Sequence, residues 1–85
     1  MKKHLAFVRS KPCMNCRTDQ NIEAHHLLVV PGKHRGIGMK HKDEWTVPLC
    51  RKYHRSLHEA GSERLFFGDE RKALDMAKYL TVIDR

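Results

Sequence analysis

The sequence has few aromatic residues and no long apolar stretch. Aromatic side chains make up 7% of the 85 residues, which leaves little bulky surface for a core, and domains of this size are often stabilised by a metal ion. No segment has the length or the apolar character of a signal peptide or a membrane span. We therefore expect one small domain, residues 1 to 85, with no membrane partner.

Cysteine is also scarce. The three cysteines cannot all pair with one another, so thiolates on zinc in a reducing cytoplasm are favoured over disulfides. Cys13 and Cys16 are separated by two residues, a spacing that lets both sulfurs reach one tetrahedral ion. We interpret this segment as a zinc knuckle.

Acidic residues are outnumbered by basic ones. The chain has 17 Lys and Arg against 10 Asp and Glu, a formal net charge of +7 and a pI of about 9.7. A solvated surface would explain the charge alone, but its position around the histidines favours the phosphate backbone of nucleic acid. The basic residues concerned are Lys33, Arg35, Lys40, Lys42, Arg51, Lys52 and Arg55.

Histidine, by contrast, is abundant, with seven residues in the chain. Single histidines are usually surface residues or satisfied partners inside a fold. His25 and His26 are adjacent, so in an extended segment one ring can hold a metal while the other reaches a water molecule. His54 and His58 lie at i and i+4 and would share one face of a helix. This combination favours a metal site.

The pattern of apolar and turn-forming residues predicts an α+β fold. Residues 2 to 9 can form a short helix, residues 21 to 30 a strand, residues 31 to 44 a long basic loop and residues 45 to 49 a second strand. Residues 50 to 60 have helical character and end before Gly61. Asp69 can cap a last helix, residues 70 to 80, whose apolar stripe is core packing.

This order of elements, with a histidine doublet on the first strand and a histidine on the helix, resembles the HNH, or ββα-metal, nuclease family. The resemblance covers residues 12 to 63 through P-C-M-N-C, E-A-H-H-L, W-T-V-P-L-C and H-R-S-L-H-E-A-G-S-E. It is most similar to small phage-type members, including RecA-dependent recombination-enhancement nucleases. The resemblance implies a zinc knuckle, a short two-stranded hairpin and flanking helices, in the cytoplasm of a bacterium or phage-infected host.

The resemblance also implies a function. His25, His54 and His58 would hold a catalytic divalent ion, which could be zinc, nickel, manganese or magnesium, and His26 would be the general base. The expected activity is metal-dependent hydrolysis of phosphodiester bonds, with DNA as the expected partner. A recombinase or packaging partner stays open.

Two positions depart from the family pattern. The resemblance implies a structural zinc on Cys13, Cys16 and Cys50, but Tyr53 stands where many members have a fourth cysteine. The fourth ligand is therefore open, and His54 is a candidate for it as well as for the catalytic ion. The asparagine that orients the base in the family aligns near a tryptophan, so we expect Asp43 or a main-chain carbonyl to orient His26.

A second class of function fits the same residues. A non-catalytic, zinc-stabilised nucleic-acid-binding module would use the cysteines and histidines for structure alone. Such a module would have no use for His26 beside His25. The other three histidines, His4, His34 and His41, are expected to be solvated or to face phosphate.

Overall fold

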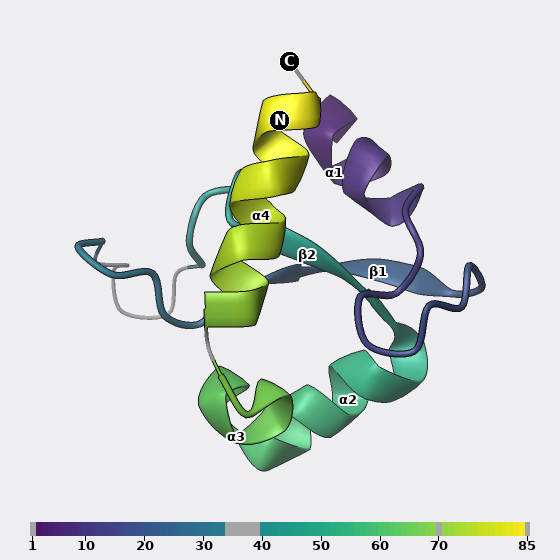
Figure 1. Cartoon of the computed structure of the whole chain (residues 1–85). Coiled ribbons are helices and arrows are strands. Elements are labelled where there is room, and N and C mark those ends of the chain that lie inside the picture. The colour runs from purple at the N-terminus through teal and green to yellow at the C-terminus, as the bar shows by residue number, and fades with distance from the viewer. Residues whose placement is uncertain (1, 34–39, 70, 85) are drawn as a thin grey trace.

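The chain folds into a two-stranded antiparallel sheet with helices packed around it (Figure 1). The computed structural model describes residues 2–33, 40–69 and 71–84. Along these residues the elements are α1 (Lys2–Arg9), β1 (Ile22–His26), β2 (Thr46–Cys50), α2 (Arg51–Ala60), α3 (Glu63–Phe67) and α4 (Arg71–Ile83). This mixture of helices and an antiparallel sheet confirms the predicted α+β class.

The hairpin places the histidine doublet at the end of β1. His25 pairs with Val47 and His26 with Thr46, and Leu27 still donates its amide to the Trp45 carbonyl at 2.9 Å. The prediction that the strand continues to residue 30 is wrong. The amides of the next two residues, Leu28 and Val29, instead donate to the Glu63 carboxylate, so no partner strand is needed there.

The core lies where α4 crosses β2 (Figure 1). Every residue of β2 is buried, and the aliphatic side chains Val47 and Leu49 are fully enclosed. The predicted apolar stripe of the last helix is confirmed as core, since Ala73, Leu74 and Ala77 join the same cluster. A strand buried on both faces fixes the position of whatever follows it, here Cys50 and α2.

Local signals explain where the helices begin and end. The Asp69 carboxylate accepts the Arg71 amide at 2.9 Å and starts α4, as predicted, although the helix continues to Ile83 rather than ending at residue 80. Gly61 adopts φ 75° and ends α2, also as predicted. The short helix α3 was not predicted, and it begins where the Ser62 hydroxyl accepts the amide of Leu65.

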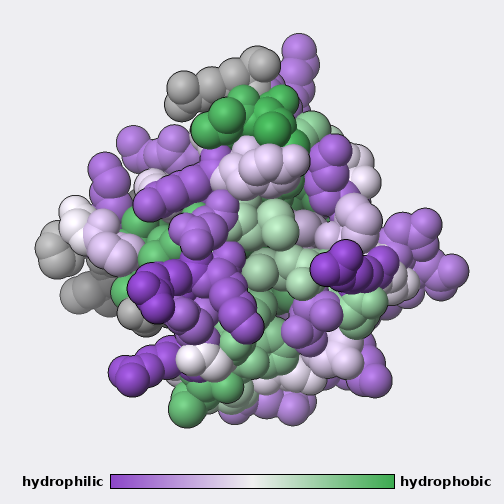
Figure 2. Space-filling model, viewed as in Figure 1, coloured by the Kyte–Doolittle hydropathy of each residue, from purple (hydrophilic) through white to green (hydrophobic). Residues whose placement is uncertain are grey.

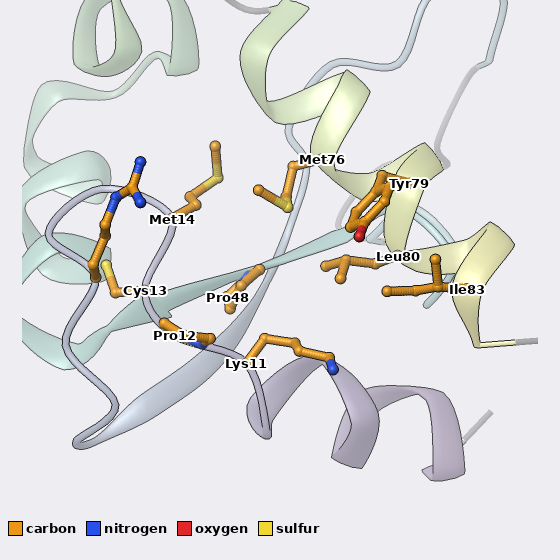
Figure 3. A pocket seen from close by; sticks show the side chains of 10 residues that line it. Lys11, Pro12, Cys13, Met14, Pro48, Met76, Tyr79, Leu80 and Ile83 are labelled. Atoms are coloured by element: carbon orange, nitrogen blue, oxygen red, sulfur yellow. The ribbon is translucent and has the colours of Figure 1, made fainter.

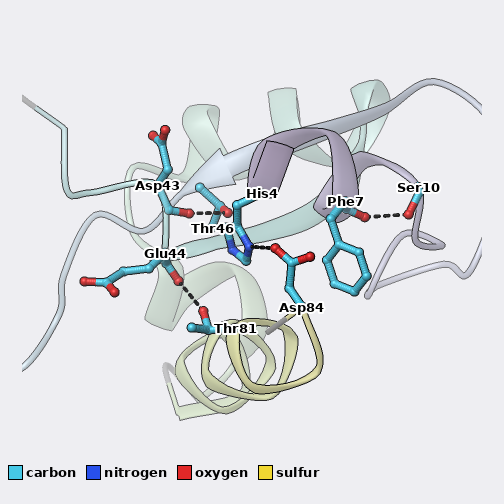
Figure 4. Close-up of polar contacts among 8 residues, drawn as sticks. All are labelled: His4, Phe7, Ser10, Asp43, Glu44, Thr46, Thr81 and Asp84. Carbon is cyan, nitrogen blue, oxygen red and sulfur yellow. Dashed lines mark hydrogen bonds and ion pairs between the residues drawn. The ribbon is translucent and has the colours of Figure 1, made fainter. Parts of the chain in front are cut away.

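The first and last helices meet near the two ends of the described chain (Figure 1). His4 Nδ1 and Asp84 Oδ2 are 2.6 Å apart, and Figure 4 shows this contact beside Thr46. The expectation of solvated histidines is wrong for His4, which is 4% exposed, and for His41, which is 8% exposed. His4 lies on α1, which packs on β1 and β2. His34 lies outside the described residues.

Candidate metal centres

The cysteine cluster is built by a turn that docks on β2. Within the turn, the Cys13 amide donates to the Thr18 carbonyl at 2.8 Å, and the Met14 amide donates to the Pro48 carbonyl at 3.0 Å. This second bond attaches the turn to the strand two residues before Cys50. The sulfur ligand atoms of Cys13, Cys16 and Cys50 consequently lie within 4.8 Å of one another.

The spacing of the sulfurs suits a tetrahedral ion. The Cys16 and Cys50 sulfurs are 3.8 Å apart, and two thiolates each at about 2.3 Å from a tetrahedral zinc lie about 3.8 Å apart. Burial raises the pKa of the Cys13 thiol, but hydrogen bonds from the backbone of Cys16, Cys50 and Asn15 outweigh it, so that pKa lies below its ordinary value. The three cysteines therefore form a cluster able to bind a metal such as zinc.

No fourth metal-ligating side chain joins this cluster within the described residues. Tyr53 stands where the resemblance to the HNH family would place a fourth cysteine. Its ring packs against Phe66, with the ring centroids 6.2 Å apart. His54, the other candidate, belongs to a separate group.

That second group consists of His25, His54 and His58, whose ligand nitrogens lie within 4.8 Å of one another. The Nε2 atoms of His54 and His58 are 3.2 Å apart. Two imidazole nitrogens at about 2.05 Å from a tetrahedral ion lie about 3.3 Å apart. The hairpin and α2 thus bring together the three histidines that the sequence analysis assigned to one ion, with donor spacing that fits it.

Buried or partly buried carboxylates orient two of these rings. Glu63, 5% exposed, has its Oε2 2.8 Å from His25 Nε2, which leaves Nδ1 as the nitrogen available to an ion. Burial, only partly opposed by Glu63, lowers the pKa of His25 and keeps the ring neutral, as a ligand must be. Glu23 Oε1 contacts His54 Nδ1 at 2.7 Å. That hydrogen bond lowers the pKa of Glu23.

His26 lies outside the cluster and has a carboxylate of its own. Its Nε2 is 2.8 Å from Asp43 Oδ1, which is one of the two orienting partners expected from the sequence. The same hydrogen bond lowers the pKa of Asp43. With Nε2 held by a carboxylate, Nδ1 of His26 is left as a proton acceptor.

Basic side chains border the histidines. A cleft of about 220 Å³ is lined by His25, His26, His54, His58 and Lys40 among others, and a second cleft of about 520 Å³ adds Arg51 and Arg55. Arg51 also forms an ion pair with Glu23 at 3.6 Å. Of the other predicted phosphate-binding residues, Lys33 and Lys42 are exposed, and Arg35 lies outside the described residues.

Sequence reasoning missed the two glutamates. Glu23 stands two residues before His25, and strand alternation predicts that both lie on one face, but the contact of Glu23 with His54 was not predicted. Glu63 is 38 positions from its histidine, and no local spacing links them. Its place in the G-S-E segment of the resemblance was the only available signal.

Fold and site together define a small α+β protein with two clusters of metal-ligating side chains. The chain belongs to the family described as "Protein of unknown function (DUF968)", whose sequence pattern matches residues 1–66. This match contains both clusters and ends before α4. Within the described residues, 2–33, 40–69 and 71–84, no helix is long and apolar enough to cross a membrane.

One curated relative is the "Uncharacterized protein YdfU" of Escherichia coli (strain K12). It is 35% identical over 57 residues, which cover 67% of this chain and 16% of the relative. The similarity therefore spans only a small part of that longer protein. No solved structure matches the chain.

Proposed function

We propose that the protein is a metal-dependent endonuclease of the HNH, or ββα-metal, type that hydrolyses phosphodiester bonds of DNA. The observation that supports this most directly is the division of labour between neighbouring histidines. His25 joins His54 and His58 in one cluster, whereas His26 is held by Asp43 beside that cluster. A ligand set next to an independently oriented base suits metal-assisted hydrolysis, in which the ion stabilises developing charge and the base takes a proton from water.

In this proposal the two clusters have different tasks. The three cysteines bind a structural zinc that attaches the turn after α1 to the end of β2, and the fourth ligand of this zinc stays open. The three histidines bind the catalytic ion. Neutral imidazoles favour zinc, nickel or manganese over magnesium because they are softer donors than oxygen.

The side chains divide the reaction between them. When bound, the ion would stabilise the negative charge that grows on the scissile phosphate and its leaving oxygen. His26 accepts the proton of the attacking water at Nδ1, and Asp43 stabilises the charged ring that results. Glu63 and Glu23 keep His25 and His54 in the orientation that directs one nitrogen of each ring towards the cluster.

The clefts beside the cluster supply the substrate contacts. Arg51 and Arg55 line one of these clefts and Lys40 lines the other, and both clefts contain His54 and His58. Phosphates bound at these residues would place a strand across the cluster. Contacts of this kind do not read bases, so we expect cleavage with weak sequence preference.

A non-catalytic, zinc-stabilised nucleic-acid-binding module is the second candidate. The cationic surface and the cysteine cluster suit it equally well. The His26–Asp43 pair does not, because a purely structural or binding role gives no reason for an oriented imidazole at the edge of a metal-ligand cluster.

Cleavage of supercoiled plasmid tests the proposal. The purified chain should lose activity after treatment with EDTA and regain it when single divalent ions are added back. Asp75→Asn is the matched control and should cleave like the unsubstituted chain. Asp75 is exposed on α4 and lines none of the clefts beside the histidines. Binding of plasmid without cleavage under every ion would favour the binding module, and cleavage of RNA alone would correct the substrate.

A further inference from the structure

A separate hollow, away from the two clefts beside the histidines, lies between the cysteine turn, β2 and α4 (Figure 3). It has a volume of about 360 Å³ and shares no lining residue with the clefts beside the histidines. We call it the α4 groove, lined by Lys11, Pro12, Cys13, Met14, Arg17, Pro48, Met76, Tyr79, Leu80 and Ile83. Its position separates it from the proposed reaction.

The surface of the α4 groove is mainly apolar. Met76, Leu80 and Ile83 follow one another along α4 at spacings of three or four residues, so they lie on one helix face. Tyr79 is 59% exposed and Ile83 42% exposed. The neighbouring Val82 extends the apolar surface beyond the groove, and Figure 2 shows apolar atoms gathered over the last turn of α4. Exposed apolar side chains gathered at a groove make it a candidate site of association.

The rim of the groove is positively charged. Lys11 and Arg17 line it, and no acidic residue does. Lys11 Nζ lies 4.5 Å from the centroid of the Phe7 ring. Arg17 is exposed and forms no ion pair with any residue in the described part of the chain. Its charge is available to a partner.

We propose that the α4 groove binds a short acidic amphipathic segment of a partner protein. Apolar side chains of the segment would fill the space between Met14 and Met76, and its carboxylates would pair with Lys11 and Arg17. Methionine side chains adapt to different apolar partners because they are flexible and polarisable. A second copy of this chain is a poor occupant, since each copy carries a net charge of +7.

Peptide display on the full chain tests this proposal. Random peptides are selected on the zinc-loaded protein, with counter-selection on the double variant Tyr79→Ser/Ile83→Ser. Tyr79 is 59% exposed and Ile83, at the end of α4, is 42% exposed, so we expect the variant to keep its fold, which a thermal melt verifies. We expect enriched peptides to combine aliphatic residues with Asp or Glu.

Binding of the enriched peptides is then measured by fluorescence anisotropy. Arg17→Glu should weaken it by at least about tenfold, because an attraction becomes a repulsion. Arg64→Glu and Leu65→Ser are the matched controls, since both positions are exposed on α3 outside the groove, and they should leave binding unchanged.

Three results would overturn the proposal. The first is enrichment of basic or uncharged peptides, and the second is equal binding to the groove variants and to the α3 controls. The third is sedimentation as a dimer that the double variant dissociates, because the groove would then hold a second copy. The nuclease proposal is unaffected by any of them, since plasmid cleavage is assayed separately.

Discussion

The two clusters of metal-ligating side chains differ in how their surroundings hold them. Cys13 and Cys50 are buried in the core cluster, and backbone amides direct the Cys13 sulfur. In the histidine cluster His25 is buried, His54 is half-buried and His58 is exposed, and open clefts reach the rings. Carboxylates orient His25 and His54. Each cluster has one exposed member, Cys16 or His58, so the clusters differ mainly in what holds their other side chains: backbone amides at Cys13 and carboxylates at His25 and His54. This difference fits the structural and reactive sites that we propose.

The largest effect should come from removing a sulfur. Cys50→Ser should leave the chain unfolded, because a structural zinc contributes about 10–16 kcal/mol of binding energy, comparable with the total stability of about 5–15 kcal/mol. Circular dichroism with a thermal melt measures the loss. His54→Ala is the contrasting variant and should keep its fold and about one zinc per chain.

If His54→Ala unfolded and Cys50→Ser stayed folded, the roles proposed for the two clusters would be wrong. If His54→Ala unfolded the domain, His54 would be a ligand of the structural zinc. A cooperative melting transition in Cys50→Ser would show that the cysteine cluster holds no stabilising ion.

Of the two candidate metal sites, Glu63 should affect only the histidine cluster. Glu63→Gln keeps a similar shape but loses the carboxylate that holds His25, so the affinity of the histidine cluster for its ion should fall by about 10–100-fold. Isothermal titration with Zn²⁺, after the cysteine site has been filled, measures this affinity. Asp75→Asn, at an exposed position of α4, should bind with the wild-type affinity.

A purely structural Glu63 would give a different result. Its bonds to the amides of Leu28 and Val29 could matter more than its bond to the histidine. In that case Glu63→Gln would lower the melting temperature of the ion-free protein while leaving ion affinity unchanged.

These contacts also show what the sequence could and could not predict. The i and i+4 spacing of His54 and His58, the Gly61 turn and the Asp69 cap are local signals, so α2 and the start of α4 were predicted. The end of β1 was not, because it depends on Glu63, which reaches the strand from α3. His4 was assigned to solvent because its polar partner, Asp84, lies 80 positions away. Local patterns cannot reveal such contacts.

The smallest effect concerns substrate binding. Arg55 is exposed and lines a cleft beside the histidines. If it contacts one phosphate, Arg55→Ala should make the negative slope of log affinity against log salt concentration shallower by about 0.9. Anisotropy with a labelled DNA duplex between 50 and 200 mM salt, on the order used for such slopes, measures it. Arg64→Ala, at an exposed position on α3, should leave the slope unchanged, and equal slopes for all three proteins would remove Arg55 from the interface.

We propose that the neighbouring histidines His25 and His26 have separate tasks. The decisive experiment measures metal content and plasmid cleavage on the same preparations of His25→Ala and His26→Ala. The account predicts that His26→Ala keeps both ions and binds DNA but loses cleavage by at least about a hundredfold. His25→Ala should lose the ion of the histidine cluster as well as cleavage. Equal loss of metal from the two variants, or full cleavage by His26→Ala, would contradict the account.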